Sequence, residues 1–363
     1  MAFRGSYEIY GAESSYFSRK VQAIFRTMEV PHEFRLKTIA ITEWLEARAG
    51  THLIPVVLTP EDWMLWDSTP IACLLQALKP QAAIVPTTPV QRISCLLFED
   101  WVDEWLVRPA VSSRWNYPDN AEEVALRLGA NAIGRWVDEE MSDEEQASAS
   151  EIGSFVRDRF GARVTRSLGA LPAQNDEIRA SFDLFCDLLA AHLEQHPYFL
   201  GDRISLADLG VVGAFMAHFS GDPEPHRWVA ERHPELHDWV RRSFDSPVTG
   251  SWLEGDVIPP TALALLDEVG RQFHPYLRAH TVALADDQKS FSCDVGNGEV
   301  EFATVPYREA SRQFIADEIA CLDQSGRAQV DEVLGTRGLL DAYLDDPVPG
   351  FDHQSPRGSR HPD

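Results

Sequence analysis

The fold of this chain is indicated most strongly by one stretch in its second half, YFLGDRISLAD at residues 198–208. Within it, Ser205 and Asp208 have the spacing of a capping box, in which the N-cap and N3 side chains each accept a hydrogen bond from the other residue's backbone N–H. Ile204 and Leu209 stand at the positions of the accompanying hydrophobic staple. The pattern predicts a helix that begins after Ser205, and it gives Asp208 a role in folding rather than in chemistry.

The sequence on both sides of this helix start has the periodicity of helices. Apolar residues recur every three or four positions over 93–105 and again over 178–193. A proline-containing stretch at 79–89 has little periodicity and is typical of a linker. We therefore expect an all-helical domain over residues 90–252.

Residues 1–80 alternate short strand patterns with helical ones. The apolar runs at 54–58 and 63–66 flank a turn of Thr, Pro, Glu and Asp, which predicts a hairpin. The order β-α-β-α-β-β-α indicates a layered α/β fold. The other strands are expected at 7–10 and 31–36, and the helices at 17–28, 42–49 and 67–78.

The character of the chain changes again after Trp252. A long helical pattern covers 261–284, and residues 291–305 alternate around Gly296-Asn297-Gly298, a hairpin signal. Two more helices are expected at 308–322 and 328–344. These patterns predict a small α+β extension over 255–345, followed by a disordered tail over 346–363.

Composition excludes several classes of function. The chain of 363 residues carries a net charge of −25, with 57 acidic against 32 basic residues. Such a surface repels phosphate backbones and anionic lipid headgroups, so we expect neither nucleic acid nor a membrane as a partner. The five cysteines lack paired spacing, which argues against a disulfide framework or a zinc site. No apolar run has the length of a signal peptide or a spanning helix, so a cytoplasmic protein is expected.

Segments in both halves resemble the glutathione S-transferase superfamily, and in particular its serine- and cysteine-type members. They are SSYFSRKV at 14–21, IPVV at 54–57, WDSTPI at 66–71 and the stretch at 198–208. The resemblance covers roughly residues 5–250. It implies a thioredoxin-like, glutathione-binding domain over 1–80 and the all-helical transferase domain over 90–252. It also implies glutathione as cosubstrate, no metal, and a two-fold homodimer.

Ser15 is the residue that the resemblance implies as catalytic. A hydroxyl at a helix N-terminus, beside free N–H groups and a partial positive charge, can hydrogen-bond a thiolate and lower its pKa. The alternative is that Ser15 only caps the helix. Tyr10 is a rival thiolate donor, and Tyr16 stands where the family commonly has a proline.

The resemblance also implies which residues bind glutathione. Pro55 corresponds to a cis proline that leaves the backbone of Ile54 free to pair with a peptide-like ligand, while Leu53 precedes this pair. Asp67 and Ser68 correspond to the pair that recognises the γ-glutamyl end of glutathione. The alternative for this pair is an ordinary helix start, which Asp, Ser and Pro all favour.

The second substrate is expected in the helical half. Tyr16, Arg114, Trp115 and Tyr117 are candidates for its pocket, because aromatic rings form flat apolar walls and arginine attracts acidic groups. Trp101 and Trp105 are expected in the core instead. His233 and His237 share a spacing of four, but Pro234 and the lack of a third ligand argue against a metal site.

Together these features predict an enzyme that activates the glutathione thiol for attack on a small aromatic or acidic electrophile. Conjugation, ether cleavage, dehalogenation and peroxide reduction share this first step, and the sequence does not separate them. The alternative is a non-catalytic binding or scaffold protein of the same fold, similar to metaxins. The long C-terminal extension and the residues Tyr16, Leu53 and Asp67 favour that alternative.

Overall fold

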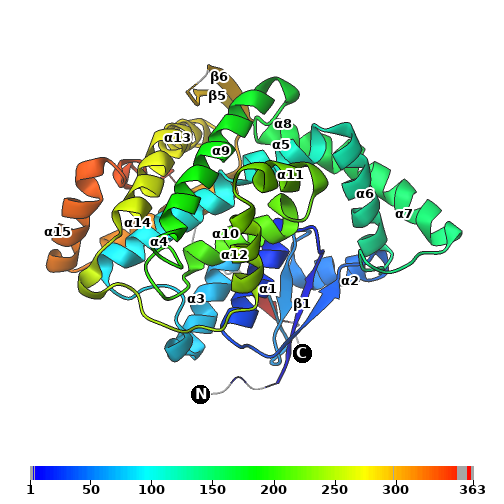
Figure 1. The fold of residues 1–363 in the computed structure, drawn as a ribbon, viewed down its shortest axis with the longest axis horizontal. Coiled ribbons are helices and arrows are strands. Elements are labelled where there is room, and N and C mark those ends of the chain that lie inside the picture. The colour runs from blue at the N-terminus through cyan, green and yellow to red at the C-terminus, as the bar shows by residue number, and fades with distance from the viewer. Residues whose placement is uncertain (1–2, 4, 297, 350–357, 361–363) are drawn as a thin grey trace.

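The computed structural model describes residues 3, 5–296, 298–349 and 358–360. An α/β part, blue in Figure 1, lies against a larger body of helices. Helices from the C-terminal third, yellow to orange, cover one side of that body. Among the described residues, none of the helices combines the length and the apolar character needed to cross a bilayer.

The α/β part has the predicted order of elements. In its sheet the strand order is β2-β1-β3-β4-β7, with β1 parallel to β2 and antiparallel to β3. This mixed sheet confirms the thioredoxin-like fold that the sequence predicted. Its elements are β1 (Tyr7–Gly11), α1 (Tyr16–Thr27), β2 (His32–Leu36), α2 (Ile39–Ala49), β3 (Val56–Leu58), β4 (Trp63–Trp66) and α3 (Ser68–Leu78).

The fifth strand comes from the far end of the chain. β7 (Gly358–Arg360) pairs antiparallel with β4, in the register Trp63↔Arg360 and Leu65↔Gly358. Ser359 Oγ also donates to the carbonyl oxygen of Arg48, at 2.5 Å. The prediction of a disordered tail over 346–363 is therefore wrong for residues 358–360. The physical reason is the open edge of β4, whose backbone groups offer hydrogen bonds to any extended segment within reach. Residues 350–357 and 361–363 of the predicted tail lie outside the described residues.

The middle of the chain is helical, as predicted. The capping box is present: Asp208 accepts from Ser205 N at 2.8 Å, and Ser205 Oγ accepts from Asp208 N at 3.5 Å. The helices are α4 (Pro89–Glu104), α5 (Val107–Trp115), α6 (Pro118–Ala132), α7 (Asp143–Phe155), α8 (Ala162–Ser167), α9 (Asn175–Leu193), α10 (Leu206–Ala214), α11 (Pro223–Arg232) and α12 (Pro234–Phe244). Two π-helical segments, η2 (Val156–Gly161) and η4 (Phe215–Phe219), adjoin α7 and α10.

The C-terminal extension also has the predicted succession of helix, hairpin and helices. Its long helix packs on α4 and α9, and its next two helices pack on α4 (Figure 1). Asn297, in the predicted turn of the hairpin, lies outside the described residues. The elements are α13 (Pro260–Ala285), β5 (Ser290–Asp294), β6 (Glu299–Ala303), α14 (Pro306–Ala320), α15 (Gln324–Val333) and α16 (Asp341–Leu344).

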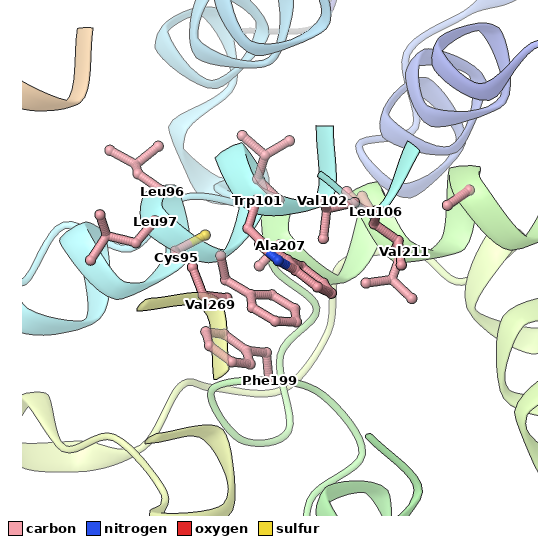
Figure 2. Packing of buried hydrophobic residues seen from close by; sticks show 14 of the residues in the cluster. Cys95, Leu96, Leu97, Trp101, Val102, Leu106, Phe199, Ala207, Val211 and Val269 are labelled. Carbon is pink, nitrogen blue, oxygen red and sulfur yellow. The ribbon is translucent and has the colours of Figure 1, made fainter. Parts of the chain in front are cut away.

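Helix α4 lies at the centre of the core. Figure 2 shows its side chains packed with Phe199, with Ala207 and Val211 of α10, and with Val269 of α13. The residues labelled there are Cys95, Leu96, Leu97, Trp101 and Val102 of α4, and Leu106 just beyond its end. The ring of Phe98 stacks on Phe199 with centroids 4.5 Å apart. Because residues of the extension belong to the same buried cluster, the extension is part of one continuous core.

Polar contacts attach the extension to the same helix. Arg308 of α14 pairs with Glu104 at 2.9 Å, and Arg92 pairs with Glu318 at 2.6 Å. The Tyr343 hydroxyl donates to Asp100 at 2.8 Å. Burial raises the pKa of Asp100 to about 7, which the hydrogen bonds from Ser311 and Tyr343 oppose only in part. The extension therefore replaces water along much of one face of α4.

Replacing Phe273 of α13 by alanine tests this continuity. The ring is fully buried and lies 5.9 Å from Trp105, centroid to centroid. Its loss leaves a cavity and should lower the free energy of unfolding by about 3–5 kcal/mol. Val282 lies on the same helix but is 62% exposed. Val282→Ala should change stability by less than about 0.5 kcal/mol.

Urea unfolding, followed by fluorescence and circular dichroism, measures both variants. We expect Phe273→Ala to shift the whole transition to lower urea while the two probes remain coincident. A separate early transition in this variant would show instead that the extension unfolds as an independent unit.

Candidate functional site

A cavity of about 720 Å³ lies between the α/β part, the helical body and the extension. This volume is within the range of small-molecule sites, about 300–1,000 Å³. The α/β part contributes Phe17 and residues 53–55 and 66–68. The other walls are formed by Asp103, Glu104, Val107 and residues between 160 and 168, and by Ser290 with residues between 301 and 308.

The predicted glutathione-binding residues all line this cavity. Leu53, Ile54 and Pro55 lie together at its wall, and the Ile54–Pro55 peptide bond is cis, as expected from the resemblance. Asp67 and Ser68 lie at the beginning of α3. The fold thus brings these two short segments of the sequence to one place.

Asp67 has an unusual backbone and a partner from the extension. Its φ of 77° is in a region that residues other than glycine rarely adopt, and such residues cluster at ligand sites. The Tyr307 hydroxyl of α14 hydrogen-bonds its side chain. Burial and the charge of Asp67 raise the pKa of Tyr307 well above its ordinary value, so Tyr307 remains a donor. Sequence reasoning missed Tyr307, because nothing local connects it with a residue 240 positions earlier.

Ser68 stands above a group of buried charges. Its Oγ donates to Asp103 Oδ2 at 3.4 Å, and the neighbouring Thr69 hydroxyl donates to Glu99 at 2.5 Å. The fully buried Lys20 ammonium lies 2.5 Å from Glu99 and 2.6 Å from Asp103. Asp103 Oδ1 has no hydrogen-bond partner among the described residues.

Burial and charge act in opposite directions on this group. Burial disfavours the charged form of Lys20, but Asp103 and Glu99 outweigh that effect and raise its pKa. Burial raises the pKa of Asp103 well above its ordinary value, and the Lys20 ammonium offsets only part of the rise. One ammonium thus contacts two buried carboxylates, and the ionisation of Asp103 depends on its presence.

Ser15 occupies the N-cap position of α1. Its Oγ accepts a hydrogen bond from Ser18 N at 3.3 Å, which confirms the capping interpretation. Among the described residues we find no acceptor for its hydroxyl proton, which leaves that proton available to a ligand. Ser15 is half-buried and is not among the residues that line the cavity, although Phe17 of the same helix is.

The rival donor Tyr10 faces away from this cavity. Its side chain belongs to a separate buried cluster with Leu45, Val56 and Met64, and its hydroxyl donates to Glu8. Burial, followed by the hydrogen bond to Glu8, raises the pKa of Tyr10 to about 12. Both features disfavour Tyr10 as the thiolate donor.

Two residues that were predicted for the second-substrate pocket are buried and bonded to partners in the protein interior. Tyr16 donates to the carbonyl oxygen of Val102 at 2.7 Å. The Arg114 guanidinium pairs with Asp222 at 2.7 Å and donates to the carbonyl oxygen of Ser14 at 2.7 Å. Neither residue lines the cavity, so their placement in the pocket is corrected.

Trp115 and Tyr117 are also absent from the cavity wall. A Cβ on Gly161 would lie 2.9 Å from Trp115 Cδ2, which shows how closely this ring packs on η2. Tyr117 packs edge-to-face on Trp228, with centroids 5.4 Å apart. Instead, residues from η2, α8 and the extension form the wall, and sequence periodicity alone does not place these segments side by side.

Other sequence predictions concern residues outside the cavity. Trp101 and Trp105 are buried in the core, as predicted, and Trp105 Nε1 donates to Gln272 at 2.9 Å. His233 pairs with Asp187 and Glu235, whereas His237 lies against Ser220. Within the described ranges, no group of three or more His, Cys, Asp or Glu residues is placed to hold a metal ion.

Two family models match this chain. Residues 9–83 match the N-terminal domain of glutathione S-transferase, and residues 172–242 match the C-terminal domain of glutathione S-transferase. A search of curated proteins finds no match.

The fold is similar to several solved structures at low sequence identity. The β-etherase LigF from Sphingobium sp. strain SYK-6 is 17% identical, with a TM-score of 0.46, over 72% of this chain and 99% of that one. A glutathione S-transferase from Rhodospirillum rubrum F11 is 15% identical, with a TM-score of 0.43, over 71% and 99%. One from Methylobacterium radiotolerans JCM 2831, solved with glutathione sulfonate, is 18% identical, with a TM-score of 0.40, over 69% and 99%.

The buried ammonium can be tested by Lys20→Met, which replaces it with an unbranched, uncharged side chain that is one atom shorter. Without the ammonium, Glu99 and Asp103 remain buried and uncompensated, so the free energy of unfolding at pH 8 should fall by about 3–5 kcal/mol. The deficit should be smaller at pH 5, because the pKa of Asp103 is raised in the folded state, so this carboxyl takes up a proton as the pH falls and no longer repels Glu99. Chemical denaturation at both pH values measures the difference.

Lys37→Met is the matched control. Lys37 pairs with Glu46 at 2.6 Å, but this pair is partly open to solvent. Its loss should cost about 1 kcal/mol or less, at either pH. Equal losses for the two variants would contradict the role given to Lys20.

Proposed function

The chain belongs to the glutathione S-transferase superfamily, and on that premise we propose that it is an enzyme that activates the thiol of glutathione for attack on a small electrophile. The observation that carries the proposal is the shared cavity of Leu53, Ile54, Pro55, Asp67 and Ser68. These are the positions that the family pattern assigns to glutathione, and they come from two separate segments of the sequence.

The γ-glutamyl end of glutathione is proposed to bind at the beginning of α3. The Ser68 hydroxyl, turned from Asp103 toward the ligand, and the backbone N–H groups of Ser68 and Thr69 suit a carboxylate, since helix N-termini carry partial positive charge. Asp67 suits the ammonium group next to that carboxylate. Its hydrogen bond from Tyr307 leaves further lone pairs for this contact. The backbone of Ile54, beside Pro55, is proposed to pair with the cysteinyl residue.

The thiol is proposed to lie near the beginning of α1. There the Ser15 hydroxyl donates a hydrogen bond to the sulfur, while its oxygen still accepts a hydrogen bond from Ser18 N. Both the hydrogen bond and the positive end of α1 favour the thiolate over the thiol. The proton leaves to solvent, and the thiolate attacks the electrophilic atom of the second substrate. A bond from sulfur forms as the leaving group departs with its electron pair.

Ser68→Ala tests the binding site. Loss of a hydrogen bond to a charged carboxylate should weaken glutathione binding about tenfold or more. Titration calorimetry at millimolar glutathione measures the affinity. Ser148→Ala, at an exposed position of α7, is the control and should bind like the wild type. If the wild type itself gives no heat, the enzyme proposal fails, and a non-catalytic binding protein of the same fold becomes the better interpretation.

Ser15 variants separate thiol activation from helix capping. In Ser15→Ala the pKa of bound glutathione should rise, and kcat/KM should fall about 10- to 100-fold. Ser15→Asp preserves a good N-cap, yet its negative charge opposes a thiolate, so it should be at least as impaired. Ser15→Thr keeps the hydroxyl and should retain most activity.

The absorbance of the bound thiolate, measured as a function of pH, gives the pKa of the glutathione thiol in the wild type and in each Ser15 variant. Kinetics with a panel of activated aryl halides, epoxides, aryl ethers and organic peroxides identifies the reaction. Full activity in Ser15→Asp would assign Ser15 to capping alone.

A further inference from the structure

Part of the cavity wall is apolar, and its residues come from two distant parts of the chain. The helical body contributes Phe160, Val164 and Leu168, and the extension contributes Phe302 and Val305. These parts are packed against each other. Gly169, directly after Leu168, has a φ of 57°, and a Cβ there would lie 2.5 Å from Val300 Cγ1 and 2.9 Å from Phe302 Cε1. This apolar part of the wall therefore has a fixed shape that suits a ring or a short hydrocarbon chain.

Another part of the cavity wall carries carboxyl groups, those of Asp67, Asp103 and Glu104. Arg308 also lines the cavity, but it is held by Glu104 at 2.9 Å and by the Tyr276 hydroxyl. This part of the wall therefore offers no unpaired arginine to a negative group of the second substrate, and such a group needs a cation elsewhere.

Arg163 and Arg166 supply such cations. Both line the cavity and are exposed, and neither side chain makes a hydrogen bond or an ion pair with any residue that the structure describes. Many other arginines of this acidic chain are paired with carboxylates. Glu301 also lines the cavity, yet no ion pair joins it to either arginine.

The local backbone directs both arginines to the same wall. They stand three positions apart on α8, and residues at this spacing share one helix face. Directly before α8, the π-helical segment η2 places Phe160 at the cavity, 49% exposed. An exposed ring beside two unpaired guanidinium groups matches a ligand that has both an apolar ring and an anionic substituent.

We infer that the second substrate is an aromatic or similarly apolar molecule that carries a carboxylate or sulfonate, and that Arg163 and Arg166 bind this anionic group. The inference rests on the proposed function, because it assigns another part of the cavity to glutathione. The apolar part of the substrate lies between Phe160 and Phe302. Its reactive atom points toward the beginning of α1, and its charge points toward α8.

A pair of fluorescent probes tests the inference without knowledge of the natural substrate. Anilinonaphthalene sulfonate carries an aromatic system with one sulfonate, and N-phenylnaphthylamine is the same system without it. In Arg163→Gln/Arg166→Gln, affinity for the sulfonate should fall about five- to twentyfold, while affinity for the uncharged probe changes less than about twofold. Phe160→Ala should lower the affinity for both probes, and that result would place the probes in this cavity.

Arg242→Gln is the matched control, because Arg242 on α12 is exposed, forms no ion pair with the residues that the structure describes, and lies far along the chain from α8. It should change neither affinity. Added salt gives a second measurement that needs no variant. It should weaken the binding of the sulfonate to the wild type and leave the uncharged probe unaffected. Three results would overturn the inference. The wild type and the double variant could bind the sulfonate with equal affinity, the double variant could lose affinity for both probes equally, or the wild type could bind neither probe.

Glutathione calorimetry on the same double variant separates this inference from the proposed function. Glutathione has two carboxylates of its own, and we expect its affinity to remain unchanged in the variant. A loss of glutathione affinity would assign the arginines to glutathione and overturn the inference. If the wild type binds no glutathione but the probes behave as expected, the proposed function fails and the anion site at α8 stands.

Discussion

One buried ammonium controls how the two halves of this protein meet. Lys20 of α1 has no access to solvent, and among the described residues its ammonium pairs only with Glu99 and Asp103 of α4. The same carboxylates accept hydrogen bonds from Ser68 and Thr69 at the beginning of α3. Close packing supports the arrangement from behind, because a Cβ on Gly213 of α10 would lie 2.6 Å from the backbone of Lys20. A buried ion pair often adds little net stability relative to an apolar pair. Its effect here is geometric: it sets α1, α3 and α4 in one orientation, and the cavity opens where these helices begin or end.

The extension adds a second constraint at the same place. Adjacent residues of α14 act in different directions: Arg308 pairs with Glu104 on α4, while Tyr307 reaches Asp67 at the beginning of α3. The hairpin β5–β6 then covers the end of α8. The extension is therefore a wall of the cavity as well as a part of the core, and the shape of the site depends on residues beyond those that the two family models match.

Most of the fold could be predicted from local patterns, whereas the far side of the site could not. Periodicity and capping residues identified the strands and helices of the α/β part and the capping box at Ser205. The ligand-facing segments 53–55 and 67–68 were found through a family pattern that is itself local.

The predicted positions of Arg114 and Tyr16 differ from those in the structure. A polar or aromatic residue near a cleft can equally bond to buried partners, as these two do with Asp222 and the Val102 carbonyl. Tyr307, Phe302 and Arg163 escaped detection because their proximity to Asp67 or to one another arises only from tertiary packing. The strand at 358–360 was missed for the same reason: its polar sequence has no pattern of its own, and the open edge of β4 determines its conformation.

The residues that form the cavity wall are translated at widely separated times during synthesis of the protein. The first four strands of the sheet are complete once residue 66 has left the ribosome, and the helical body once residue 244 has left it. Residues 290–308 are translated much later, and the strand β7 that borders β4 is translated later still. Until then Glu104 and Asp100 of α4 lack their partners Arg308 and Tyr343. A chain that stops before residue 290 therefore lacks one wall of the cavity, and a small molecule can be enclosed only after the extension has been translated.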